Sequence, residues 1–261
     1  MSRAVALDHV GIVGHDLDAL AAVFVDLGFQ LTPLARHEGG RTGNRCVMLA
    51  EGGYLELLST LDGGTSATLQ RFLSYHAGAH ILALEIGDPD LVLQRLRLAW
   101  DAVPHITYTQ RLLDDADPAA GLVGFALITP PDPPEGRVHL IQHTTPGTQW
   151  RDGFLRHLNN AVALEEVHLH VPSPAVTAAW YSVLAGRPVV PDSDGGYRLD
   201  LPRGRVRILP GSSPPLISGI TLRTSDAATA IRLHLTDRGM SFDITNNMVE
   251  IDAAGVTLRF T

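Results

Sequence analysis

One local pattern occurs four times along the chain and constrains the fold more than any other feature. Each copy has a short apolar strand, a turn rich in Asp, Ser or Pro, and then an amphipathic helix. The copies cover residues 10–20, 81–91, 167–176 and 220–230. Strand-like stretches, separated by turn signals such as Gly52-Gly53 and Asn246-Asn247, follow each helix. The repeat therefore predicts a βαβββ module present four times.

Polar caps and glycines mark the expected helix ends. In the first copy, apolar residues recur at helical intervals, at Leu17, Leu20, Ala21, Phe24 and Leu27. The expected N-cap residues of the four helices are Asp16, Asp88 or Asp90, Ser173, and Ser225 or Asp226. Glycines follow three of the helices as C-terminal stops, at Gly28, Gly186 and Gly239.

The modules fall into two pairs along the chain. Residues 1–145 hold modules one and two, and residues 164–261 hold modules three and four, which are shorter and are expected to be degenerate. The stretch 146–163 has no strand pattern, so we interpret it as a linker with at most a short helix. The sequence therefore predicts two domains of paired modules.

Composition narrows the class of protein. With 45% hydrophobic and 18% charged residues among 261, the chain is typical of a soluble globular protein. Its one cysteine, Cys46, excludes an internal disulfide and a cysteine-rich zinc site. All 20 basic residues are arginines, which excludes Schiff-base chemistry on a lysine. A net charge of -8 and the lack of a basic stripe argue against a nucleic-acid partner.

The chain also lacks the signals of a membrane or secreted protein. No apolar run approaches the roughly 20 residues that span a bilayer. The start, Met1-Ser2-Arg3-Ala4, has no apolar signal core. We therefore expect a cytoplasmic protein that does not contact membranes.

Two side chains with metal-binding capacity stand on apolar strands. His9 follows Asp8, and Glu56 is flanked by two leucines. Burying such groups is costly unless they are paired, hydrogen-bonded or bound to a ligand. The alternatives to a ligand are a backbone carbonyl for His9 and an arginine, such as Arg41 or Arg45, for Glu56.

Four phrases carry a resemblance to a known superfamily: residues 7–10 (Leu-Asp-His-Val), 16–18 (Asp-Leu-Asp), 26–29 (Asp-Leu-Gly-Phe) and 53–58 (Gly-Tyr-Leu-Glu-Leu-Leu). Together with the fourfold repeat, they resemble the vicinal oxygen chelate superfamily of glyoxalases, extradiol dioxygenases and bleomycin-resistance proteins. The nearest likeness is to bacterial proteins with a glyoxalase-like domain. The resemblance implies an α+β fold in which four βαβββ modules pair into two curled mixed sheets, with the helices packed outside. Modules three and four are then expected to buttress the first pair or to form a homodimer.

The resemblance also implies a metal site, because ligands in this superfamily come from the first and last strands of each module. His9 and Glu56 occupy these positions in module one, and His139 occupies the last-strand position of module two. Two histidines and one carboxylate leave coordination positions open and suit divalent Fe, Mn, Ni, Co or Zn. His80, on the first strand of module two, stands two residues early. Val167 aligns with His9, so modules three and four look empty of ligands.

Further residues are expected around this metal. His143 shares a strand face with His139 by period-two alternation, so it is a second candidate ligand. If it is not a ligand, we expect either His143 or a metal-bound water to carry protons beside the metal. Arg41 and Asn44, in the loop that leads into the third strand, and Tyr54 are expected to contact the substrate.

The implied function is a metal-dependent enzyme that acts on a small, oxygen-rich substrate. Such enzymes bind two adjacent substrate oxygens to the metal, and the reaction here would be of lyase, isomerase or dioxygenase type. Module two lacks the second glutamate of the glyoxalase I ligand set. The alternative is a metal-free binding or sequestration protein of the bleomycin-resistance type, in which Glu56 is the counter-charge of an apolar or cationic ligand. A scaffold without a small ligand is the third alternative.

Overall fold

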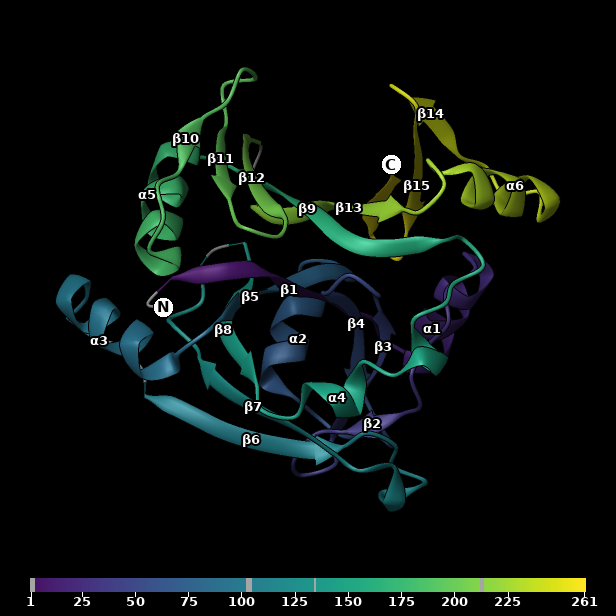
Figure 1. The fold of residues 1–261 in the computed structure, drawn as a ribbon, viewed down its shortest axis with the longest axis horizontal. Coiled ribbons are helices and arrows are strands. Elements are labelled where there is room, and N and C mark those ends of the chain that lie inside the picture. The colour runs from purple at the N-terminus through teal and green to yellow at the C-terminus, as the bar shows by residue number, and fades with distance from the viewer. Residues whose placement is uncertain (1–2, 102–104, 134, 212–213) are drawn as a thin grey trace.

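The computed structural model contains two mixed sheets of the same topology (Figure 1). It describes residues 3–101, 105–133, 135–211 and 214–261. Within these residues each sheet has eight strands, ordered β2-β3-β4-β1-β5-β8-β7-β6 and β10-β11-β12-β9-β13-β16-β15-β14. At the centre, the first strands of two modules pair antiparallel, and each runs parallel to the last strand of its own module. The predicted fold of paired βαβββ modules is confirmed.

The first half of the chain forms the sheet around β1 and β5. Its elements are, in order, β1 (Ala4–Val13), α1 (Leu17–Asp26), β2 (Ala35–Arg36), β3 (Thr42–Met48), β4 (Tyr54–Thr60), α2 (Ala67–Leu73), β5 (Gly78–Ile86), α3 (Pro89–Ala99), β6 (Ile106–Leu112), η1 (Pro118–Ala120), β7 (Leu122–Ile128) and β8 (Arg137–His143).

The second half follows two short helical turns, α4 (Pro146–Gln149) and η2 (Asp152–Phe154). Its elements are β9 (Ala161–Val171), α5 (Pro174–Ala185), β10 (Val190–Pro191), β11 (Tyr197–Asp200), β12 (Arg205–Pro210), β13 (Leu216–Thr224), α6 (Thr229–Asp237), β14 (Asp243–Thr245), β15 (Met248–Ala253) and β16 (Val256–Phe260). Strand β9 therefore begins two residues before the expected end of the linker at residue 163.

The expected helix caps hold in the first half and differ in the second. Asp16 accepts hydrogen bonds from two backbone N–H groups of α1, and Asp88 caps α3 in the same way. Ser173 precedes α5, but its side chain accepts no hydrogen bond from the first turn of the helix. Before α6, Asp226 accepts from the backbone N–H of Ala230 at 2.8 Å, although the helix itself begins at Thr229.

The largest apolar core of the described residues lies between the two sheets and belongs to both halves. Its fully buried members include Val10 of β1, Phe24 of α1, Val167 of β9, Tyr181 of α5 and Phe260 of β16. Figure 1 shows the first sheet curled into a nearly closed cup and the second sheet opening away from it. The two concave faces therefore point in opposite directions, and the core joins their convex faces.

Backbone hydrogen bonds also join the two halves. Leu7 donates its N–H to the carbonyl of Arg203 at 3.0 Å, and Arg203 donates to the carbonyl of Val5 at 3.2 Å. Glu51 donates to the carbonyl of Val162 at 2.9 Å. Strand β1 is thus held from behind by the second half of the chain.

One helix was not expected from the sequence. Helix α2 lies between modules one and two, and Ser66 caps its first turn. It buries Leu69 and Phe72 against Val13, Leu58 and Ile81, which closes one side of the first cup. Of the helices that the structure describes, none is both long and apolar enough to cross a membrane.

Candidate functional site

The concave face of the first sheet surrounds a cavity of about 360 Å³. The sequence-predicted residues that line it are His9, Asn44, Tyr54, Glu56 and His139. A volume of a few hundred Å³ is the usual size of a small-molecule site. The structure therefore brings five of the seven predicted site residues to one cavity, and leaves Arg41 and His143 outside its wall.

A β-bulge in β1 brings Asp8 and His9 together. Leu7 pairs with Leu84 of β5, and His9 pairs with the next residue, Ala83, so Asp8 is the extra residue of the bulge. Neighbours on a regular strand point to opposite faces. Here the Oδ1 atom of Asp8 lies 2.7 Å from Nδ1 of His9.

This contact fixes the chemistry of the His9 ring. Burial would raise the pKa of Asp8, but the charges and hydrogen bonds of His143 and His9 lower it to about 2. The carboxylate can therefore only accept, so Nδ1 of His9 donates. The lone pair of a neutral ring then lies on Nε2, which faces the cavity 3.8 Å from Oε2 of Glu56. The ring also stacks on Tyr54, with centroids 4.5 Å apart.

Glu56 of β4 is held as a carboxylate. Its Oε1 atom accepts from Nδ2 of Asn44 at 2.5 Å and lies 3.5 Å from Nε2 of His37. Burial would raise the pKa of Glu56, but the hydrogen bond from His37, the charges of His9 and His37, and the bond from Asn44 hold it well below its usual range. Glu56 is thus satisfied by imidazole and amide groups.

Neither arginine considered from the sequence is the partner of Glu56. Arg41 is exposed and lies outside the cavity wall, and Arg45 has its ion pair with Asp18, at 3.9 Å. Sequence reasoning missed His37 instead. The β2–β3 hairpin brings His37 next to Asn44, and the Gly39-Gly40 turn was the available signal.

His139 of β8 lies across the cup from Glu56. Its ladder partner is Ala83, the residue that also pairs with His9. Nδ1 of His139 lies 2.8 Å from Oγ1 of Thr129. Burial and the charge of His9 lower the pKa of His139 to about 4, so the ring is neutral at pH 7.

His80 lies outside the cavity wall, in keeping with its two-residue offset. Its ring stacks on Phe72, with centroids 4.8 Å apart, and its Nε2 atom lies 2.8 Å from the carbonyl of His76. Ile81 lines the cavity in its place. Strand β5 therefore contributes an apolar side chain, and no histidine, to this part of the cavity wall.

His143 lies behind Asp8 rather than in the cavity. Its Nε2 atom is 3.0 Å from Oδ2 of Asp8, and its ring meets the edges or faces of Phe125 and Trp150. His143 borders a second cavity on the far side of β1, also lined by Arg203. A hydrogen-bonded row therefore runs from His143 through Asp8 to His9.

The described side chains around the cavity could supply ligands for a metal ion, but they are not arranged around one. As the side chains stand, no group of three or more His, Cys, Asp or Glu residues within 3–101, 105–133, 135–211 and 214–261 is arranged to hold a metal. The chemistry of the donors nonetheless fits: His139 offers a neutral imidazole, Glu56 offers a carboxylate, and Nε2 of His9 lies 3.8 Å from that carboxylate. Glu56 makes its contacts with His37 and Asn44 instead.

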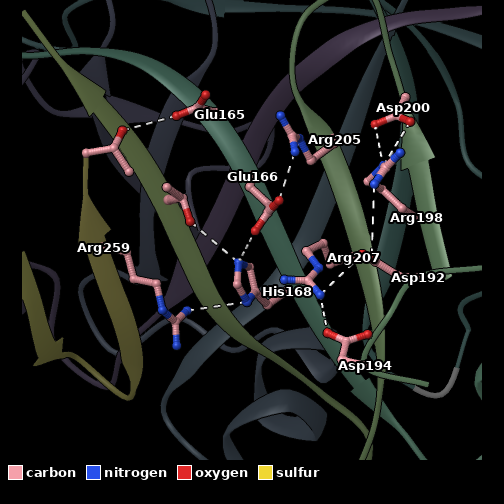
Figure 2. Close-up of polar contacts among 12 residues, drawn as sticks. Glu165, Glu166, His168, Asp192, Asp194, Arg198, Asp200, Arg205, Arg207 and Arg259 are labelled. Carbon is pink, nitrogen blue, oxygen red and sulfur yellow. Dashed lines mark hydrogen bonds and ion pairs between the residues drawn. The ribbon is translucent and has the colours of Figure 1, made fainter. Parts of the chain in front are cut away.

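The concave face of the second sheet is built from ion pairs (Figure 2). His168 of β9 contacts Glu166 through Nε2 at 2.6 Å, and its Nδ1 atom lies 3.4 Å from Arg259 of β16. Arg207 of β12 pairs with Asp192 and Asp194. Figure 2 shows these side chains gathered over neighbouring strands, with Arg198 and Asp200 at one side.

Ladder register shows which residues of the two sheets correspond. His9 and Glu166 each stand seven residues before the N-cap of the following helix, at Asp16 and Ser173. Val167, which the sequence alignment matched to His9, is fully buried in the core. That alignment was wrong by one residue, a shift that moves every side chain to the other face of a strand.

With His9 matched to Glu166, the other ligand positions follow. Gly11 pairs with Glu56 in the first sheet, and the corresponding pair in the second sheet is His168 with Arg207. Ala83 pairs with His139, and its counterpart Thr221 pairs with Arg259. The second cup thus has Glu166, Arg207 and Arg259 where the first has His9, Glu56 and His139.

Comparison with known proteins places the chain in a family. A model of the glyoxalase-like domain matches residues 7–185, more than half of the chain. The chain belongs to the glyoxalase-like domain family. The match begins just before the Asp8–His9 pair and extends through α5, so it includes part of the second half. No curated protein sequence matches the chain.

Solved structures share the fold of this glyoxalase-like protein. A hypothetical protein from Staphylococcus aureus has a TM-score of 0.74 at 17% identity, with 98% of this chain and 99% of that chain covered. The Mn(II)-bound glyoxalase from Novosphingobium aromaticivorans has a TM-score of 0.59 at 16% identity, covering 99% and 82%. BphC, a halotolerant catechol dioxygenase, has a TM-score of 0.59 at 14% identity, covering 100% and 87%. The resemblance to the vicinal oxygen chelate superfamily is confirmed.

Proposed function

We propose that this protein is a metal-dependent enzyme that acts on a small, oxygen-rich substrate in the first cup. The observation that carries the proposal is the convergence of His9, Glu56 and His139 on one cavity from the first and last strands of two paired modules. The reaction would be of lyase, isomerase or dioxygenase type. The Mn(II)-bound glyoxalase and the catechol dioxygenase of the same fold are consistent with such chemistry.

His9, Glu56 and His139 would hold a divalent Fe, Mn, Ni, Co or Zn ion. A bound metal would polarise a substrate oxygen or lower the pKa of a bound water. The chain prepares the site for this role, because Asp8 directs the Nε2 lone pair of His9 inward and His37 keeps Glu56 ionised. Donor groups that are already deprotonated need release no proton when a metal binds.

Asn44 and Tyr54 would position the substrate beside this centre. Both line the cavity, and Asn44 also steadies the Glu56 carboxylate. His143 would act through Asp8, as a group that donates to Asp8 and keeps it charged, since it does not reach the cavity. A proton held on His143 would be separated from the substrate by Asp8 and His9.

A metal-free binding protein is the second candidate. It is favoured by one observation, that no three potential ligand side chains in the described residues are arranged around one point. In that case the Glu56 carboxylate would face a cationic or apolar ligand directly. The same cavity would then bind without catalysis.

Elemental analysis of the purified, untagged protein separates the two. We expect near-stoichiometric metal in the wild type and its loss in His9→Ala and Glu56→Gln. The matched controls are His168→Ala and Glu166→Gln, which remove a histidine and a glutamate from the second cup. These controls are expected to retain the metal.

One result would contradict the metalloenzyme proposal. A wild-type protein that is free of metal and takes up no added iron, manganese, nickel or zinc would refute the metalloenzyme and leave the binding protein. Circular dichroism of each variant would show that metal loss reflects the ligands rather than unfolding.

A further inference from the structure

One arginine on the wall of the first cavity forms no ion pair with any carboxylate that the structure describes. Arg111 of β6 lines the cavity together with Glu56 and His139. Its Nη1 atom donates to the carbonyl of Leu112 at 3.1 Å, and its guanidinium carbon lies 6.0 Å from the centre of the Phe125 ring. Among the described residues it forms no ion pair with Asp or Glu.

The other arginine of the wall shows the contrast. Arg137 also lines the cavity, but its Nε atom lies 3.0 Å from Oδ1 of Asp132, which Arg71 also contacts. Its charge is therefore neutralised within the protein. A half-buried guanidinium without a carboxylate, such as that of Arg111, retains an unbalanced positive charge.

The thiol of Cys46 does not balance that charge. Cys46 of β3 interacts with Arg111, but burial raises the pKa of this thiol to about 12. The thiol is therefore neutral at pH 7. The charge of Arg111 is left for a group that enters the cavity.

We infer that the substrate is a small carboxylate with an apolar body, whose carboxylate pairs with Arg111. This inference rests on the proposed function, in that the first cup is taken as the substrate site. A guanidinium offers two parallel N–H donors that match a carboxylate. The apolar body would contact the apolar part of the cavity wall, which includes Leu58, Leu69, Ile81, Leu127 and Ile141.

The charge balance supports an anion over the cationic ligand of the alternative function. Glu38, an exposed residue, adds a second carboxylate to the wall beside Glu56. A divalent metal on Glu56, His9 and His139, together with Arg111, would still leave the interior of the cup with a net positive charge. Without a metal, Arg111 shares the wall with Glu56 and Glu38. A cationic ligand would meet the guanidinium in either state.

The test measures binding of three acids, phenylacetate, phenylpyruvate and isovalerate, each beside its methyl ester and a primary amine with the same apolar body. Saturation-transfer NMR and titration calorimetry are run on metal-free and Mn(II)-loaded protein. We expect the acids to bind at least about tenfold more tightly than their esters, since hydrogen bonds to charged groups are worth more than a factor of ten in affinity. The amines are expected to bind least.

Variants assign the preference to one side chain. Arg111→Gln should remove the difference between acid and ester, and Arg111→Lys should restore part of it through its charge. Arg97→Gln, on the exposed surface of α3, is the matched control and should keep the full preference. Thermal melting of each variant confirms that it is folded.

The outcomes separate this inference from the proposed function. If the protein binds no metal but still prefers acids through Arg111, the enzyme proposal fails and this inference stands. If metal binds but esters match acids, if no acid binds, or if Arg111→Gln keeps the preference, this inference is overturned. Phosphorylated analogues that bind more tightly than all the acids would also overturn it, because the predicted group is a carboxylate.

Discussion

The two cups have one topology and opposite chemistry. At three corresponding ladder positions the first cup has His9, Glu56 and His139, and the second has Glu166, Arg207 and Arg259. Guanidinium groups have no lone pair to offer, so Glu166 is the one member of the second set that could coordinate a metal. The first cup surrounds a cavity, whereas the second is covered by mutual ion pairs (Figure 2). The shared sheet topology therefore does not determine the chemistry of each cup, which depends on a few inward-facing side chains.

Removing the partner of a buried charge should have the largest effect on stability. His143→Ala leaves the buried Asp8 carboxylate without one of its two histidines and is expected to lower the free energy of unfolding by about 3 kcal/mol. Asp200→Asn breaks a pair with Arg198 in the second cup, where Asp200 is 53% exposed, and should cost less than about 1 kcal/mol. Urea unfolding of both variants measures this difference. Equal losses would contradict it.

The second-largest effect is expected from removing the hydrogen bond between Asp8 and His9, which should weaken metal binding. In Asp8→Asn the side-chain amide can donate to Nδ1, which moves the ring proton to Nε2 and blocks ligation. We expect the affinity for Mn(II) to fall about 10- to 100-fold. Glu165, which precedes Glu166 as Asp8 precedes His9, provides the control: Glu165→Gln removes a contact with Thr261 and should not change the affinity. Calorimetric titration with Mn(II) is the measurement, and an unchanged affinity in Asp8→Asn would refute the role.

Part of the pH dependence of stability should come from His139 in the first cup, alongside His80, whose pKa burial also lowers to about 4. In the metal-free protein the pKa of His139 is lowered from 6.5 to about 4, so the unfolded chain binds a proton at a pH where the folded protein does not. This contribution to stability is complete above pH 6.5 and is lost as the pH falls toward 4, by on the order of 3 kcal/mol.

Urea midpoints measured in EDTA from pH 7 to 4 check this. His139→Gln should flatten the decline, and His15→Gln, in the exposed turn before α1, should leave it as in the wild type. A decline of unchanged steepness in His139→Gln would assign the pH dependence elsewhere.

The smallest effect is expected from converting the second cup. Replacing Glu166→His, Arg207→Glu and Arg259→His places the ligand types of the first cup at the corresponding positions. We expect a second, weaker equivalent of Mn(II), because the new ligands would lie among the ion pairs of Asp192, Asp194 and Arg198 rather than beside contacts like those of His37 and Asn44. Elemental analysis after dialysis counts the metal ions. A stoichiometry unchanged from the wild type would show that ladder position alone does not make a ligand.

Much of the fold followed from the sequence because its signals are local and repeated. Strand, cap and helix recur in order, and Asp16 and Asp88 cap the helices as expected. Helix α2 was missed because it is one short segment with only two buried apolar residues. The Val167 alignment failed because a one-residue shift leaves the apolar content of β9 almost unchanged while reversing its faces.

The site was predictable where a polar residue interrupts an apolar strand. His9, Glu56 and His139 meet that description, and all line the cavity. His37 and Arg111 do not, because a histidine beside a turn and an arginine on a polar strand look like surface residues in the sequence. Their importance comes from the curl of the sheet, which brings β2 and β6 to the cavity.

The backbone hydrogen bonds between Arg203 and β1 limit how this protein can be shortened or recombined. A fragment that ends at residue 145 would lose both bonds and expose the convex side of the strand that carries Asp8 and His9. The C-terminal half therefore supports the structure of the N-terminal half, whether or not the second cup binds a ligand. Hybrids that exchange halves between relatives would have to keep the loop at Arg203 to preserve the geometry of the distant site.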